Sequence, residues 1–192
     1  QIYQPEKFGD MKWRMIGPHR GGRTVGAVGV PQQPNVFYIG VNNGGVWKTT
    51  DYGRTWVPIF DDQPTGSVGD IAVSPSNPSV LYVASGEGLQ RPDLSVGNGM
   101  YKTTDGGKTW DRVLYMDENT GAIQVLIDPQ DPNTVYASMW QARQGPWENA
   151  AWQGPNSGLY KSTDGGNTWK KLAKGLPTYE QGLGRIGISV AP

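Results

Sequence analysis

Aspartates that could act as acids or metal ligands recur in one motif of this sequence. Asp51, Asp105 and Asp164 each lie in the pattern Ser/Thr-Thr-Asp-x-Gly-x-Thr-Trp, which occurs three times in 192 residues. A carboxylate just before a glycine can also clamp a tight turn, because it accepts hydrogen bonds from the N–H groups that follow it. Three copies at the same place in three repeats suit architecture better than a single active site, so we interpret these aspartates as turn clamps. The glycines would supply the positive φ of a hairpin and the tryptophans would anchor the return strand. The full structural set is Asp51, Gly53, Trp56, Asp105, Gly107, Trp110, Asp164, Gly166 and Trp169.

Catalysis by carboxylates would need a placed pair elsewhere in the chain. Glu87 and Glu148 are the candidates, since glycosidases usually use two carboxylates about 5–10 Å apart. The alternative is that both are solvated loop charges. His19 is the only histidine and the chain has no cysteine, which excludes a multi-histidine metal site and a cysteine nucleophile within this chain. The sequence predicts neither a metal ion nor a cofactor.

The elements that position these residues repeat together with the motif. A second pattern, P-x-x-P-x-x-x-Y, places Tyr38, Tyr82 and Tyr136 ahead of the three motif copies. The step from a motif aspartate to the next tyrosine is 31 residues both times, whereas the step from tyrosine to motif aspartate is 13, 23 and 28 residues. Short β-branched and aromatic runs, bounded by proline, glycine and asparagine, give four expected strands per repeat, A to D in chain order. Four short antiparallel strands per repeat are typical of a β-propeller blade, so the sequence predicts an all-β fold.

The repeats predict a partial β-propeller over residues 1–192. Residues 1–22 would be a leading segment with a lone outer strand at Trp13–Ile16, and 23–60, 61–115 and 116–175 would be three blades. Residues 176–192 would hold the first strand of a next blade. Three blades do not close a ring, so we expect further blades of the same polypeptide, another subunit or a second copy to complete it. The first residue is Gln, which suits an excerpt or a chain whose signal peptide has been removed.

Binding residues are expected in the B–C loops, where nearly all the length variation between repeats lies. Insertions on one face often mark a binding face, and tryptophan rings stack on sugars or peptides while polar groups fix orientation. The alternative is that the rings only hold the longest loop against its blade. The D–A loops at the same end add polar groups such as Asp61 and Arg185. The predicted binding face consists of Asn42, Asn43, Glu87, Arg91, Arg143, Trp147, Glu148 and Trp152.

Charge and hydropathy narrow the classes of partner. Seventeen basic and seventeen acidic residues cancel, and no basic stripe is present, which argues against nucleic acid. No apolar run is long enough to insert into a membrane. A glycan or a peptide remains as the expected ligand.

The three motif copies resemble those of Asp-box, or BNR-repeat, β-propellers: sialidases, xyloglucan-type glycoside hydrolases and sortilin (VPS10) ectodomains. The opening Trp13…Arg23, together with Gly44–Asp51, looks most like large secreted bacterial proteins of this group, which implies an extracellular or periplasmic location. In such families the Asp-box lies at the C–D hairpin, away from the ligand. Xyloglucan hydrolases carry a catalytic Asp in the first B–C turn, just before Gly-Gly. Here Asn42 and Asn43 precede Gly44-Gly45, and this departure counts against that activity.

Three functional hypotheses follow from the residues and the resemblance. The first is a secreted propeller that acts as a binding or scaffold module for a glycan or an extended peptide. The second is a glycoside hydrolase of sialidase or xyloglucanase type whose catalytic residues lie partly outside this segment, so that catalysis by this segment alone is not expected. The third is a sortilin-like peptide-binding protein or complex subunit.

Overall fold

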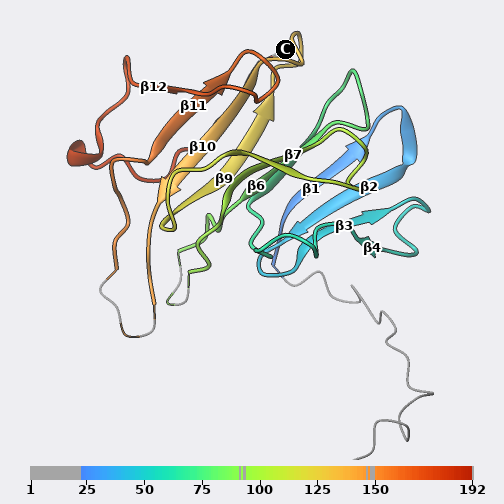
Figure 1. Cartoon of the computed structure of the whole chain (residues 1–192), viewed down its shortest axis with the longest axis horizontal. Coiled ribbons are helices and arrows are strands. Elements are labelled where there is room, and N and C mark those ends of the chain that lie inside the picture. The colour runs from blue at the N-terminus through green and yellow to red at the C-terminus, as the bar shows by residue number, and fades with distance from the viewer. Residues whose placement is uncertain (1–22, 91, 93, 146, 148–149, 192) are drawn as a thin grey trace, which may run out of the picture.

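The fold consists of three four-stranded antiparallel sheets, seen in a computed structural model that describes residues 23–90, 92, 94–145, 147 and 150–191 (Figure 1). Within each sheet the strands follow chain order, so each is a simple up-and-down meander. The all-β prediction of four-stranded propeller blades is therefore confirmed. Blade one contains β1 (Thr24–Val30), β2 (Gln33–Val41), β3 (Gly45–Thr49) and β4 (Val57–Pro58). Blade two contains β5 (Asp70–Val73), β6 (Leu81–Ser85), β7 (Gly99–Thr103) and β8 (Asp111–Leu114). Blade three contains β9 (Thr120–Ile127), β10 (Val135–Gln141), β11 (Gly158–Ser162) and β12 (Lys170–Leu172).

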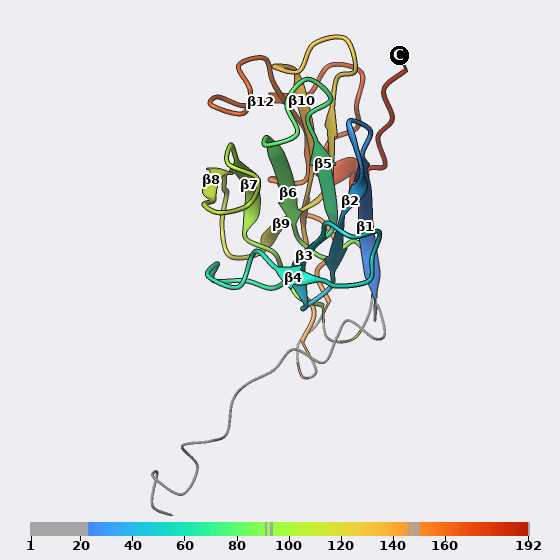
Figure 2. The same ribbon diagram turned by 90° about the vertical axis from the view of Figure 1, so that its right-hand side faces the viewer.

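The three sheets stand side by side, with blade two between the other blades (Figures 1 and 2). The first strands of successive blades are neighbours, since β1 contacts β5 and β5 contacts β9. This is the arrangement of adjacent propeller blades, in which the A strands line the inner edge. The strands of blade one lie within residues 24–58, those of blade two within 70–114 and those of blade three within 120–172.

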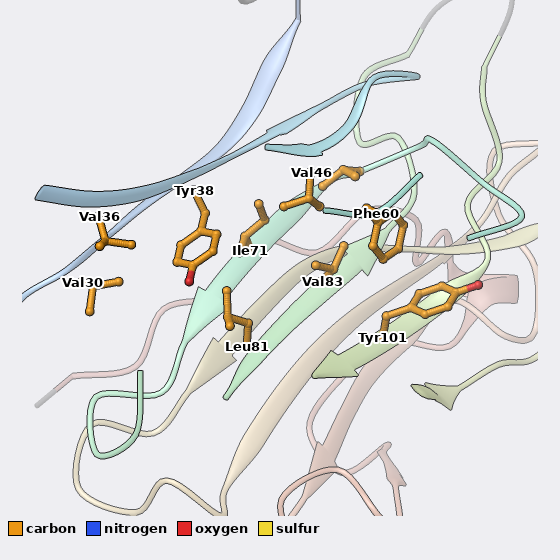
Figure 3. Close-up of a cluster of buried hydrophobic side chains, with 10 residues drawn as sticks. Val30, Val36, Tyr38, Val46, Phe60, Ile71, Leu81, Val83 and Tyr101 are labelled. Carbon is orange, nitrogen blue, oxygen red and sulfur yellow. The ribbon is translucent and has the colours of Figure 1, made fainter. Parts of the chain in front are cut away.

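The core lies between the blades because blade two is apolar on both of its faces. Successive residues of a strand point to opposite faces, and every residue of β6 is buried. Leu81 and Val83 join the cluster shared with blade one, which is drawn in Figure 3. Tyr82 and Ala84 join the cluster shared with blade three. One strand thus contributes to two hydrophobic interfaces, which fixes the stacking of all three blades.

The end of the chain is held by side chains and not by a sheet. Residues 184–191 lie in the segment 176–192, which is predicted to hold the first strand of a next blade, and they pair with no strand of the described chain. Side chains hold it instead: the amide of Gln124 bonds both the N–H and the C=O of Ile188, at 2.8 and 3.0 Å, and Ser138 Oγ donates to Ile186 O at 2.7 Å. A strand needs the backbone of a second strand beside it, and the described residues supply none there. The short 3₁₀ turn η2 (Tyr179–Gln181) precedes this stretch.

Two further expectations concern the leading segment and membrane insertion. The predicted lone strand at Trp13–Ile16 lies in 1–22, outside the described residues. Among the residues that are described, no helix is long and apolar enough to cross a membrane.

Candidate functional site

The Asp-box aspartates lie in the C–D hairpins, at the end of each blade opposite the B–C loops. Asp105 accepts hydrogen bonds from Thr103 Oγ1, from Thr109 Oγ1 and from the N–H groups of Lys108 and Thr109, at 2.7–3.0 Å. Three of these contacts recur at Asp51 and Asp164: those from the hydroxyl two residues before the aspartate, and from the N–H and the hydroxyl of the threonine four residues after it. Donors so close to the carboxylate favour its charged form, and this geometry is that of a turn clamp.

The pKa values of these carboxyls report the same hydrogen bonds. The pKa of Asp51 is lowered to about 2, chiefly by the hydrogen bond from the Thr55 hydroxyl. The pKa of Asp164 is lowered to about 2 in the same way by the Thr168 hydroxyl. Thr109 likewise holds the pKa of Asp105 well below its usual range. A carboxyl that is so firmly ionised is a poor general acid near neutral pH, so the Asp-box ends of the blades are not where acid catalysis is expected.

At the other end, Asn42 and Glu87 meet across the junction between blades one and two. Asn42 Nδ2 donates to Glu87 Oε1 at 3.1 Å, and the backbone N–H of Ser95 donates to Glu87 Oε2 at 2.9 Å. Both side chains are buried: Asn42 is 6% exposed and Glu87 is 2% exposed. This revises their place on the predicted binding face, and it also excludes the alternative of a solvated Glu87, because stacking of the two blades encloses the pair.

A polar pocket of about 400 Å³ opens between the B–C turn of blade one and the D–A loop that leads to blade two. Asn43 lies on its rim, exposed and in a left-handed backbone conformation with φ of 58°. Asp61, Gln63 and Thr65 line the pocket from the D–A loop. Sequence reasoning had singled out Asp61 but missed Gln63 and Thr65. The available signal was their position in the D–A loop at the same end of the blade as the Asn-Asn-Gly-Gly turn.

The tryptophans of blade three separate into two kinds. Trp140, which is 3% exposed, stacks on Trp152 with ring centroids 5.9 Å apart and an angle of 15° between the rings, and its Nε1 donates to Trp152 O at 2.8 Å. Arg185 lies over the Trp140 ring at 5.5 Å and donates to Gly88 O of blade two. Trp152 is therefore engaged in holding the loop. By contrast, Trp147 is 96% exposed and is free to stack on a ligand.

The remaining residues of the predicted face are only partly located. Arg143 is exposed in the same loop, where it forms a bridge with Ala151 and donates from Nη1 to Asn119 Oδ1 at 3.2 Å. Arg91 and Glu148 lie outside the described residues. Within the described part of the chain, no group of three or more acidic or histidine side chains is arranged to hold a metal ion.

The family follows from comparison with known proteins. A family model described as "Sortilin, neurotensin receptor 3" matches residues 44–183, which include all three Asp-box motifs. The chain belongs to the Sortilin-Vps10 family. The predicted resemblance of this Sortilin-Vps10 chain to sortilin-like and xyloglucanase-like Asp-box propellers is confirmed.

Relatives of this Sortilin-Vps10 chain include xyloglucanases. It is 26% identical to xyloglucanase Xgh74A of Acetivibrio thermocellus over 82% of this chain and 21% of that protein. It is 24% identical to a probable oligoxyloglucan-reducing end-specific xyloglucanase of Neosartorya fischeri, over 85% of this chain and 19% of that protein. The chain thus spans about a fifth of the length of these curated relatives.

Solved structures show the same fold. An ancestral GH74 enzyme superposes with a TM-score of 0.63 at 20% identity, covering 85% of this chain and 20% of that chain. YCF48 from Cyanidioschyzon merolae superposes with a TM-score of 0.55 at 19% identity, covering 88% of this chain and 44% of that chain. At these identities the likeness establishes the fold alone.

Proposed function

We propose that this chain is part of a polysaccharide-acting propeller of xyloglucanase type, and that it contributes a saccharide-binding surface at the B–C end of its blades. The observation that carries the proposal is the similarity to xyloglucanases over more than four fifths of the chain. An extracellular or periplasmic location belongs to the same proposal, since polysaccharides of this kind lie outside the cell.

The surface would combine an exposed ring with a polar pocket. The three B–C connections, β2–β3, β6–β7 and β10–β11, project at the same end of the blade stack, the lower end in Figure 1. Trp147 supplies a flat apolar ring on the third of them, and Asn43, Asp61 and Gln63 supply hydrogen-bonding groups beside the first. Sugar rings offer apolar faces for stacking and hydroxyl groups for amides and carboxylates, so the two features suit one extended glycan.

Of the two suspected carboxylates, Glu87 is the one whose burial argues against a role in hydrolysis. The amide of Asn42 cannot accept a proton as a base, and Glu87 is buried against Asn42 and Ser95. Asp61 is the carboxylate that lines the pocket. The proposal therefore assigns binding to this segment and leaves the catalytic pair of the whole protein partly outside it.

The test is binding of xyloglucan and xyloglucan oligosaccharides by the complete protein, measured by calorimetry. Trp147→Ala should weaken binding by about 1–3 kcal/mol, the range for a contact that acts as a hot spot, and Asp61→Ala should weaken it further. Trp147→Phe is the matched control, because it keeps an aromatic ring at the same position. Binding that survives both alanine changes in a folded protein would overturn the proposed surface.

A second candidate, recognition of an extended peptide, is favoured by the family match itself, whose description names a neurotensin receptor. The same binding assay separates the two. Peptide binding without glycan binding, lost on Trp147→Ala, would assign the surface to a peptide. Binding of neither class would favour the scaffold role.

A further inference from the structure

The polar pocket between blades one and two is held by bonds between and within its two loops. Gly45 N donates to Gly66 O at 2.9 Å, which ties the B–C turn of blade one to the D–A loop. Within the D–A loop, Gln63 N donates to Phe60 O at 3.1 Å. A pocket whose walls are already fixed loses less entropy when a ligand enters, so its shape and charge can select among ligands.

A buried ring anchors the D–A loop immediately before its carboxylate. Phe60 is 1% exposed, and its ring lies edge to face against the rings of Tyr101 and Trp110, with centroids 5.1 and 5.2 Å away. Figure 3 shows the first of these two ring pairs. Asp61 is the next residue along the loop and is exposed. The packing of Phe60 therefore fixes the point on the loop from which the Asp61 side chain projects.

The carboxylate of Asp61 lies close to the glycine turn of blade one. A Cβ added at Gly45 would lie 3.7 Å from Asp61 Oδ1, so the carboxylate stands beside a position that carries no side chain. Gly45 has φ of 68°, in the left-handed region that favours glycine. Within the described chain, no hydrogen bond or ion pair engages the Asp61 carboxylate. Its oxygens are therefore available to a ligand in the pocket.

The charge of the pocket has one sign. Among the lining residues that the structure describes, Asp61 is the one ionisable side chain, and Asn43, Gln63 and Thr65 contribute neutral amides and a hydroxyl. Amides and hydroxyls both donate and accept hydrogen bonds, so they do not discriminate by charge. A carboxylate only accepts, and it attracts cations and repels anions. Discrimination by charge in this pocket thus depends on Asp61.

Two arginines at the same end of the blades are engaged elsewhere. Arg143 donates from Nη1 to Asn119 Oδ1 at 3.2 Å. Arg185 lies over the Trp140 ring at 5.5 Å and donates to Gly88 O. Neither arginine lines the pocket, so neither of them offsets the charge of Asp61 for a ligand that binds there.

We propose that this pocket ranks sugar units by charge, with Asp61 as the residue that determines specificity: an ammonium group binds better than a hydroxyl, and a hydroxyl better than a carboxylate. The inference rests on the proposed saccharide binding and adds the chemical class of saccharide, neutral or amino sugars in preference to acidic ones. Hydroxyl and ammonium groups donate hydrogen bonds to Asp61, and the charge of an ammonium group strengthens its bond. A sugar carboxylate has no proton to donate near neutral pH and is repelled.

The experiment is calorimetry on the complete protein with three matched forms of one xyloglucan oligosaccharide. The forms are the parent, a form whose primary hydroxyls are oxidised to carboxylates, and a form in which ammonium groups replace those hydroxyls. At low ionic strength the carboxylate form should bind roughly three- to tenfold more weakly than the parent, and the ammonium form should bind more tightly by a similar factor. A steric effect would weaken both modified forms, whereas charge moves them in opposite directions. Because Asp61 is exposed, both differences should shrink in about 1 M salt.

Three variants locate the effect. Asp61→Asn keeps the shape of the side chain and removes its charge, so the affinities for the three forms should converge. Gln63→Glu adds a second carboxylate to the pocket lining and should widen the differences. Asp62→Asn is the matched control: Asp62 is an exposed neighbour that does not line the pocket, and the same charge change there should leave the wild-type ranking in place.

The outcomes separate this inference from the proposed function. If the wild type binds the three forms equally, or if Asp61→Asn keeps the ranking, charge selection is wrong and the saccharide-binding surface stands. An Asp62→Asn chain that loses the ranking as fully as Asp61→Asn would also overturn the inference, because the effect would then come from net charge. Binding of none of the forms by the wild type would overturn both proposals. A folded Gln63→Glu chain that does not widen the differences would contradict the inference even where Asp61→Asn fails to fold.

Discussion

Replacing Asn42 with aspartate would put a second carboxylate against Glu87 in the buried junction between blades one and two. The amide of Asn42 now donates to Glu87 across 3.1 Å, and both side chains are at least nine-tenths buried. Two ionised carboxylates at that distance would repel by about 5 kcal/mol at an effective dielectric constant of 20. Taking up one proton instead costs about 1.4 kcal/mol per pH unit above the usual carboxyl pKa near 4, or about 4 kcal/mol at pH 7. The O–H···O⁻ bond formed on protonation recovers part of this, so we expect Asn42→Asp to lower the free energy of unfolding by about 2–4 kcal/mol at pH 7.

The sign of the pH dependence follows from proton uptake. The pKa of the introduced carboxyl is raised in the folded state, so between the unfolded value near 4 and that raised value the folded chain holds one more proton than the unfolded chain. Stability of the variant relative to wild type therefore falls as pH rises through this window, by about 1.4 kcal/mol per unit, and is recovered toward pH 4.

Urea denaturation followed by tryptophan fluorescence, at about pH 5 and about pH 7.5, measures the difference directly. Asn43→Asp is the control, since Asn43 is exposed at the pocket rim and its substitution should show little pH-dependent loss. An Asn42→Asp chain as stable as wild type at the higher pH, or one whose deficit does not shrink at the lower pH, would refute the assignment of a buried amide–carboxylate contact.

Three further outcomes are expected. The pKa of Asp51 and of Asp164 is lowered to about 2, so the stability that these carboxylates contribute is present above their unfolded pKa near 4 and is lost as pH falls toward 2. Changing both residues to asparagine should therefore reduce the fall of the thermal unfolding midpoint between about pH 4 and about pH 2. Tyr82→Phe removes one of two donors to Gly165 O and should cost about 1 kcal/mol in urea denaturation, because the carbonyl keeps the other donor. Met139→Ala empties a fully buried position and should cost about 2–5 kcal/mol in the same assay.

Sequence reasoning predicted the parts of the fold that depend on residues close together in the chain. The hairpin turns and the four strands of each blade follow from residues that are close in sequence, such as Thr49, Asp51 and Thr55. The burial of Glu87 does not, because it is created by Asn42, 45 residues earlier, when two blades stack. Trp147 and Trp152 lie five residues apart in one loop, yet one is exposed and the other stacks on Trp140; spacing alone carries no information on which ring finds a partner.

Contacts along the inner strands explain why residues 184–191 keep their place without a sheet partner. Asp70 lies 54 residues before Gln124, the repeat distance, and its Oδ2 accepts from the N–H of Val125 on the next blade's inner strand at 3.1 Å. Gln124 makes the corresponding contact with Ile188 N. Burial raises the pKa of Asp70, opposed by its two backbone donors, Val125 and Ile71, so this link costs desolvation that the hydrogen bonds offset. The same inner position therefore joins blade two and blade three to the chain that follows each of them, first as a carboxylate and then as an amide.

The two ends of the blades consequently carry different constraints. At the Asp-box end, glycine, tyrosine and lysine fit one another closely enough that a single Cβ at Gly107 would clash with Ile59, and the sequence repeats there with little change. At the B–C end, the side chains of the described loop residues serve different purposes from blade to blade. One holds the buried Asn42, one contributes Glu87 to it, and one presents the exposed Trp147. A surface free of the stacking requirement can vary while the blades stay joined, and this physical difference is a reason for our proposal of ligand recognition at the B–C end.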